Sequence, residues 1–179
     1  MKTLLAFILF ALSSLTYVNA TDNKTIRIST KDTDLILQVG ENGRLYQTYL
    51  GEKLLHEQDL QHFQWNIHAG SDGSVSKRGW EVYSGSGNED FFEPAISITH
   101  HDGNPSTILY YVSSSDKAVE GGTETTILLR DDQYPVEVTL HYIAYPKENI
   151  IKTWSEIRHE EEKPVTLSCE AYTSLCFNN

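Results

Sequence analysis

Four side chains within one short stretch have the chemistry of a carbohydrate contact. Residues 80–96 read WEVYSGSGNEDFFEPAI, and they combine the aromatic Trp80 and Phe91 with the acidic Glu81 and Asp90. Aromatic rings pack against the apolar faces of sugars, and carboxylates accept hydrogen bonds from sugar hydroxyls. We therefore predict that these four residues lie near a bound carbohydrate. The alternative is a corner of the protein core, since aromatic residues at strand ends usually pack inward.

No catalytic or metal-binding pattern accompanies this stretch. The seven histidines show no HExxH spacing, and the adjacent His100 and His101 are expected to point to opposite faces of a strand. No G-x-S-x-G nucleophile motif occurs, and the Gly-Ser-Gly loop lacks the helix and lysine of a phosphate-binding loop. A glycosidase needs two carboxylates about 5 Å or about 6.5–9.5 Å apart, for which Glu81, Asp90 and Glu156 are candidates, but solvated strand carboxylates are the simpler interpretation. We expect no catalytic residue, no metal site and no cofactor.

The elements that must position these residues are expected to be β-strands. From Ile26 onward, apolar and polar residues alternate between turn signals, which is the pattern of a half-buried antiparallel sheet. Asn42-Gly43 and Asp102-Gly103 supply the positive φ that tight hairpins need. Residues 52–60 are the one candidate helix, and its length makes it marginal. The sequence thus predicts an all-β antiparallel sandwich with strands at 26–30, 34–39, 44–50, 62–68, 79–84, 95–101, 107–113, 123–130, 135–145, 150–158 and 164–174.

The clearest of these strands follows Pro135. Apolar residues occupy every second position from Val136 to Ala144, and the expected partner strand is 150–158. Proline at the strand's start is tolerated because the missing N–H lies outside the ladder. The partner strand, with Ile151, Thr153, Ser155 and Ile157 at every second position, alternates more weakly.

Composition limits the partners that the chain can have. It holds 14 Lys and Arg against 25 Asp and Glu, which gives a net charge of −11. Binding to nucleic acid needs clustered cations that neutralise phosphates, and this chain lacks them. The same acidity argues against contact with an anionic membrane. We expect neither nucleic acid nor membrane as a partner.

The first 20 residues have the three parts of a secretory signal peptide. Met1 and Lys2 form a short cationic start, residues 4–15 form an apolar stretch, and the small residues before and at Ala20 suit signal peptidase. The apolar stretch is shorter than the roughly 20 residues that span a bilayer. We therefore expect cleavage after Ala20, export to the periplasm or the extracellular space, and a folded domain over 21–179.

The two cysteines, Cys169 and Cys176, carry little information about function. On one continuous strand they would lie roughly 23 Å apart, far beyond the roughly 7 Å limit for a disulfide. They pair only if the chain turns between them, so we expect two free thiols.

The order of segments resembles the amino-terminal domain of glycoside hydrolase family 36 α-galactosidases. The stretches that carry the resemblance are DGNPSTILYYVS and TETTILLRDDQYPVEVTLHYIAYPKENIIKTWSEIRHEEEKPVTL, and residues 123–167 are the most specific. The resemblance runs from about Ile26 to the end of the chain. It implies a β-supersandwich of the galactose mutarotase-like type, packed against a downstream (β/α)8 barrel that carries both catalytic aspartates. No barrel segment occurs in this sequence, so the resemblance implies a truncated sandwich that is incomplete at its C-terminal end and inactive alone.

The carbohydrate-type stretch also takes part in the resemblance. Family members carry Y-P-x-x-G-x-G-D-F-R-x-P-A, and the matching positions here are Tyr83, Gly87, Asp90, Phe91, Pro94 and Ala95. Three positions depart from the pattern, with Ser84 in place of Pro, Glu89 in place of Gly and Phe92 in place of Arg. In the family this region is expected near the barrel mouth, sometimes that of a neighbouring subunit. The resemblance therefore implies that Asp90 helps wall a sugar pocket.

Two functions from different classes remain open at this point. The first is a non-catalytic amino-terminal domain of an exported α-galactosidase-like glycoside hydrolase. Its partners would be an α-galactoside-type carbohydrate, a catalytic barrel missing from this chain, and further copies in a homo-oligomer. The second is a self-standing carbohydrate-binding β-sandwich. The first is favoured because the meander ends without a cap, which leaves a strand edge available for pairing.

Overall fold

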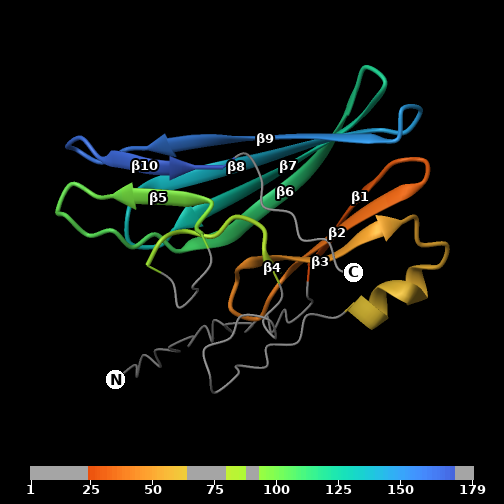
Figure 1. Cartoon of the computed structure of the whole chain (residues 1–179), viewed down its shortest axis with the longest axis horizontal. Helices are drawn as coiled ribbons and strands as arrows, with labels where there is room; N and C mark the ends of the chain where they lie inside the picture. The colour runs from red at the N-terminus through yellow and green to blue at the C-terminus, as the bar shows by residue number, and fades with distance from the viewer. Residues whose placement is uncertain (1–23, 64–79, 88–92, 172–179) are drawn as a thin grey trace, which may run out of the picture.

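The part of the chain that the structure describes forms two four-stranded antiparallel sheets and one two-stranded sheet (Figure 1). This computed structural model describes residues 24–63, 80–87 and 93–171. The first sheet has the order β1-β2-β3-β4, with β1 Thr25–Ser29, β2 Thr33–Val39, β3 Leu45–Glu52 and β4 Trp80–Glu81. The second sheet has the order β6-β7-β8-β9, with β6 Leu109–Val119, β7 Gly122–Asp131, β8 Val136–Tyr145 and β9 Ile150–His159. The small sheet pairs β5 Ile96–Thr99 with β10 Thr166–Glu170.

The core lies between the inner faces of these sheets. In β8 every second residue is buried, and the buried set is Val136, Val138, Leu140, Tyr142 and Ala144. These side chains form one cluster with apolar residues of the first sheet, namely Ile26, Ile28, Leu35, Leu37 and Leu45. Each large apolar side chain that is fully buried stabilises the fold by about 1.5–3 kcal/mol. The predicted all-β antiparallel sandwich is therefore confirmed.

The pairing of β8 with β9 is also as predicted. The register runs from Val136 opposite His159 to Tyr145 opposite Ile150. Gly43 has a φ of 76°, and its turn joins the paired strands β2 and β3 as predicted. Gly103 has the expected positive φ, 89°, but its turn is not a hairpin, because β5 pairs with β10 and β6 pairs with β7. The β6–β7 hairpin turns at Gly121, whose φ is 78°. Figure 1 shows the tip of this hairpin projecting beyond the rest of the sheet.

Several predicted elements differ from the structure, and the strand predicted at 79–84 is only the two-residue β4. A 3₁₀ helix, η1, spans Glu57–Phe63, so the strand predicted at 62–68 does not begin where expected and its remaining residues lie outside the described ranges. The helix predicted at 52–60 is this shorter 3₁₀ turn, because a segment of this length cannot offset the cost of nucleating an α-helix. Strand β6 runs on to Val119, well past the predicted end at 113. The added part, Ser114–Val119, shows no apolar alternation because pairing with β7, not burial, holds it in place.

Several predictions concern residues that the structure does not describe. Residues 1–20, Asp90, Phe91 and Cys176 all lie outside the described ranges. Cys169 lies in β10 and carries a free thiol. In the portion of the chain that is described, no helix has the length and apolar character needed to cross a bilayer.

Candidate functional site

Two of the predicted carbohydrate residues form the short strand β4. Trp80 pairs with Gln47 and Glu81 pairs with Tyr46 of β3. The Glu81 side chain is only 5% exposed, and its two oxygens accept hydrogen bonds from Arg44, with 2.9 Å between Nε and Oε1 and a second contact from the Nη2 atom. Burial lowers the pKa of Arg44, but the hydrogen bonds and charge of Glu81 outweigh it and raise that pKa. A sugar hydroxyl at Glu81 would therefore share the carboxylate with Arg44.

The chain after β4 leads into the Asp90 loop from a fixed base. Tyr83 is buried, and its hydroxyl lies 3.3 Å from Oγ of Ser155 on β9. The next residues run parallel to the start of β5, with Gly85 bridged to Ile96. The amide of Ile96 donates to the carbonyl of Ser84 at 3.1 Å, and the amide of Ser86 donates to the carbonyl of Ile96 at 3.0 Å. Both ends of the loop are thus tied to each other.

Ser84 lies at the position where the family pattern has proline, and its side chain makes a hydrogen bond that proline could not make. Its Oγ accepts a hydrogen bond from the amide of Ala95 at 3.4 Å. Two more hydrogen bonds hold the end of the loop that leads into β5. The amide of Ala171, just after β10, donates to the carbonyl of Ala95 at 2.7 Å. Sγ of Cys169 in β10 donates to the carbonyl of Pro94 at 3.6 Å.

A second segment, residues 104–107, packs directly against this base. The amide of Thr107 donates to the carbonyl of Ser86 at 3.0 Å, and Oγ of Ser86 donates to the carbonyl of Pro105 at 2.6 Å. The approach is so close that a Cβ atom on Gly85 would lie 1.9 Å from the carbonyl oxygen of Thr107. Only glycine fits between the two backbones here.

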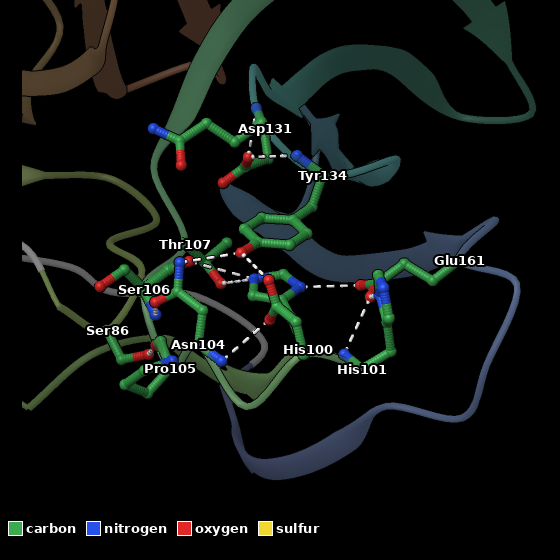
Figure 2. Close-up of polar contacts among 12 residues, drawn as sticks. Ser86, His100, His101, Asn104, Pro105, Ser106, Thr107, Asp131, Tyr134 and Glu161 are labelled. Carbon is green, nitrogen blue, oxygen red and sulfur yellow. Dashed lines mark hydrogen bonds and ion pairs between the residues drawn. The ribbon is translucent and has the colours of Figure 1, made fainter.

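A buried polar cluster supports segment 104–107 from the other side (Figure 2). His100 is buried, and its Nε2 lies 3.0 Å from the carbonyl oxygen of Ser106 and 3.2 Å from Oγ1 of Thr107. Its Nδ1 lies 2.7 Å from Oε1 of Glu161, which follows β9. The ring of Tyr134 stacks on the His100 ring, with 3.5 Å between centroids and 6° between planes.

The carboxylate of Glu161 binds both neighbouring histidines. Its Oε2 lies 2.7 Å from Nδ1 of His101 and accepts a hydrogen bond from the His101 amide at 3.1 Å. Burial alone raises the pKa of Glu161, but the hydrogen bonds from His100 and His101 outweigh it and lower that pKa to about 2. The prediction that His100 and His101 point to opposite faces is wrong. Both residues follow the end of β5 at Thr99, so the alternation of a strand does not apply to them.

Tyr134 completes the cluster by joining a third turn to it. Its hydroxyl donates to Oδ2 of Asp102 at 2.9 Å and accepts a hydrogen bond from Nδ2 of Asn104 at 2.9 Å. The β5–β6, β7–β8 and β9–β10 turns therefore meet at one end of the sandwich. No sequence motif points to this cluster, since Glu161 reads only as one acid in a polar turn. Over the described ranges, no group of three or more His, Cys, Asp or Glu side chains is arranged to hold a metal ion.

An open groove of about 440 Å³ lies between β9 and β10. Its apolar lining includes Ile157, Val165 and Leu167, and its polar lining includes Ser155, His159 and Glu170. No Trp, Tyr or Phe side chain of the described residues lines it. Because sugar sites usually offer a ring for stacking, this groove is a poor candidate for a carbohydrate site.

Comparison with known proteins identifies the domain. Residues 43–179 match the model of the glycosyl hydrolase family 36 N-terminal domain. No curated protein matches the chain by sequence.

Three of the similar solved structures are bacterial enzymes. The α-galactosidase from Lactobacillus brevis has a TM-score of 0.69 at 18% identity, with 84% of this chain and 23% of that chain covered. The α-galactosidase AgaB from Geobacillus stearothermophilus has a TM-score of 0.68 at 20% identity, with 86% and 24% covered. A variant of AgaA from the same organism, in complex with raffinose, has a TM-score of 0.69 at 19% identity, with 84% and 24% covered.

These structures share the fold of this chain, which spans about a quarter of their length. The family model covers most of the sequence, including the strands from β3 to β10 and the three turns that meet at Glu161. The resemblance drawn from the sequence is confirmed, and the chain belongs to glycosyl hydrolase family 36 as a form of its N-terminal domain.

Proposed function

We propose that this chain is the non-catalytic N-terminal domain of an exported α-galactosidase-like glycoside hydrolase. In this role it supports the catalytic barrel and helps wall the sugar pocket with the loop that contains Asp90. The observation that carries the proposal is the fixed base of this loop, where Gly85 is held between Ile96 and Thr107 in a domain of family 36. A wall attached to a rigid base loses little conformational entropy when sugar binds.

The carboxylates of the sandwich support a non-catalytic role. Asp34 accepts hydrogen bonds from Arg27, Ser29 and the amide of Leu54. Asp131 accepts from the backbone amides of Ile108, Gln133 and Tyr134. Glu81 and Glu161 are held by Arg44 and by the two histidines, as described above. These acids hold the fold together, whereas retaining hydrolysis needs two carboxylates about 5–5.5 Å apart on either side of a sugar.

We propose three partners. They are an α-galactoside-type carbohydrate, the catalytic barrel, which this chain does not contain, and further copies of the protein in a homo-oligomer. We also propose export to the periplasm or the extracellular space, which the expected signal peptide supports.

The test begins with the DNA downstream of the codon for Asn179. An in-frame continuation with barrel motifs, whose product releases nitrophenol from a nitrophenyl α-galactoside, is the expected result. In that product Asp90→Asn should raise KM or lower kcat with little change in melting temperature, because Asp90 is proposed to face the sugar. Asp132→Asn removes the same charge from an exposed turn and serves as the control.

Two results would contradict the proposal. Loss of stability with unchanged kinetics in Asp90→Asn would show that this residue packs instead of facing sugar. Tight galactoside binding by the 179-residue chain, with no continuation in the gene, would favour the self-standing carbohydrate-binding module.

A further inference from the structure

Each ring nitrogen of His100 faces an oxygen that can only accept a hydrogen bond. Nδ1 lies 2.7 Å from Oε1 of Glu161, and Nε2 lies 3.0 Å from the carbonyl oxygen of Ser106. A neutral imidazole carries one N–H, so it can donate to only one of these oxygens. The other nitrogen would then direct a lone pair at an acceptor.

One competing arrangement exists for a neutral ring. Oγ1 of Thr107 lies 3.2 Å from Nε2 and can donate its proton to that nitrogen. In this arrangement the carbonyl oxygen of Ser106, which is closer, faces a lone pair at 3.0 Å. Protonation of both nitrogens removes this repulsion, because Nε2–H then donates to Ser106 while Nδ1–H donates to Glu161.

The surroundings of His100 favour a cation. The side chain of His100 is 0% exposed and that of Glu161 is 1% exposed, and the pKa of about 2 keeps Glu161 ionised. A buried carboxylate is costly unless a cation and hydrogen bonds compensate it. His101, which contacts the other oxygen of Glu161, is 37% exposed, so its ring is also in contact with water.

The remaining groups around His100 are anionic or aromatic. Asp102 lies on the same turn as His100, and the β7–β8 turn contributes the stacked ring of Tyr134 with Asp131 bound to its amide. An aromatic face stabilises a cation stacked on it. Among these described neighbours, His101 is the only group that can carry positive charge.

We propose that His100 carries a proton on both ring nitrogens in the folded protein at neutral pH, and that this imidazolium is a positioning residue for the Gly85–Gly87 turn. It joins Glu161 to Ser106 and Thr107, and Ser86 binds the same segment through Thr107 and Pro105. Any effect of His100 on a sugar pocket rests on the proposed function. The protonation state of His100 does not depend on that function, so either claim can be refuted without the other.

We expect alkaline pH to weaken the hydrogen bonds that connect Glu161, His100 and Ser106. Loss of the second proton leaves a lone pair of Nε2 facing the carbonyl oxygen of Ser106 at 3.0 Å. The contact that joins Glu161 to Ser106 and Thr107 therefore weakens when alkaline pH removes that proton, and the folded protein should lose stability.

Nitrogen-15 NMR of the histidine side chains in the intact protein tests the protonation directly. At pH 7, both ring nitrogens of His100 should show a directly bonded proton. A bare Nε2 at pH 7 would overturn the proposal. Thr107→Val removes the hydroxyl but leaves Ser106 in place, so the ring should keep both protons in this variant.

The pH dependence of melting supplies a second, independent readout. The melting temperature of the protein should fall between pH 7 and pH 9, and His100→Gln should remove this fall. His101→Gln is the matched control, because it contacts the same carboxylate from a more exposed position and should retain the fall. An equal alkaline fall in His100→Gln would also overturn the proposal. If this variant does not fold, the NMR measurement on the unaltered protein still decides.

Discussion

Gly85→Ala is the sharpest test of how the Asp90 loop is attached. The added Cβ would lie 1.9 Å from the carbonyl oxygen of Thr107 and 2.8 Å from its carbonyl carbon. Both are backbone atoms, so no side chain can rotate away. Gly85 is not among the glycines with positive φ, and alanine therefore meets a collision here without added backbone strain.

The cost follows from the distance. Ordinary contacts begin at 3.4 Å, so the two backbones must separate by about 1.5 Å. Such a shift breaks the 3.0 Å hydrogen bond from the amide of Thr107 to Ser86, which contributes about 1 kcal/mol. Overpacking adds about 1–3 kcal/mol. We expect a loss of about 2–4 kcal/mol, which lowers the melting temperature by about 4–16 °C in a domain of this size.

Thermal melting followed by circular dichroism measures the effect, and Gly103→Ala is the matched control. Gly103 has a φ of 89°, and no atom lies within 4 Å of the point that an added Cβ would occupy, so alanine there adds strain without collision. That strain costs about 1–2 kcal/mol. The reasoning is refuted if Gly85→Ala melts at the same temperature as Gly103→Ala or higher.

The other contacts lead to three further predictions. Arg44→Ala removes the Arg44 cation from the buried Glu81 carboxylate and should cost about 3–5 kcal/mol in urea unfolding, whereas the double variant with Glu81→Ala should recover part of that loss. Because the pKa of Glu161 is lowered to about 2, the Glu161 carboxylate stabilises the fold above about pH 4.5, and this stability is lost as the pH falls toward about 2. The urea midpoints at pH 5 and pH 3 should therefore differ less in Glu161→Gln than in the unaltered protein. The chain alone should release no nitrophenol from a nitrophenyl α-galactoside, and turnover that survives removal of contaminating glycosidases would require a catalytic pair within the sandwich.

Strands with one buried face could be predicted from the sequence. The alternation from Val136 to Ala144 appears in the structure as alternating burial, and the partner strand lies where expected. Alternation fails as a guide where a strand is solvated on both faces. The outer half of β6 reads Ser-Ser-Ser-Asp-Lys, and its place in the sheet comes from its pairing with β7.

Side-chain partners distant in sequence could not be predicted in the same way. The sequence marks Glu81 as an acid beside aromatic residues, but its partner Arg44 lies 37 residues earlier in the chain. His100 and Glu161 are 61 residues apart and both lie in turns, where no period relates one side chain to the next. Their contact depends on three turns that meet at one end of the sandwich, which is a property of the topology.

The Gly-Ser-Gly stretch shows how a local motif gains its meaning from a distant segment. The sequence excludes a phosphate-binding loop there, because no helix and no lysine follow, but it gives no other reason for two glycines. In the structure both glycines border residues 106–107: a Cβ on Gly85 would strike the carbonyl of Thr107, and one on Gly87 would lie 2.3 Å from Oγ of Ser106. Between them, the amide and hydroxyl of Ser86 donate hydrogen bonds to Ile96 and Pro105, and its carbonyl accepts one from Thr107. The spacing is therefore required by the close approach of two backbones, and the same approach connects the loop base to the cluster around His100.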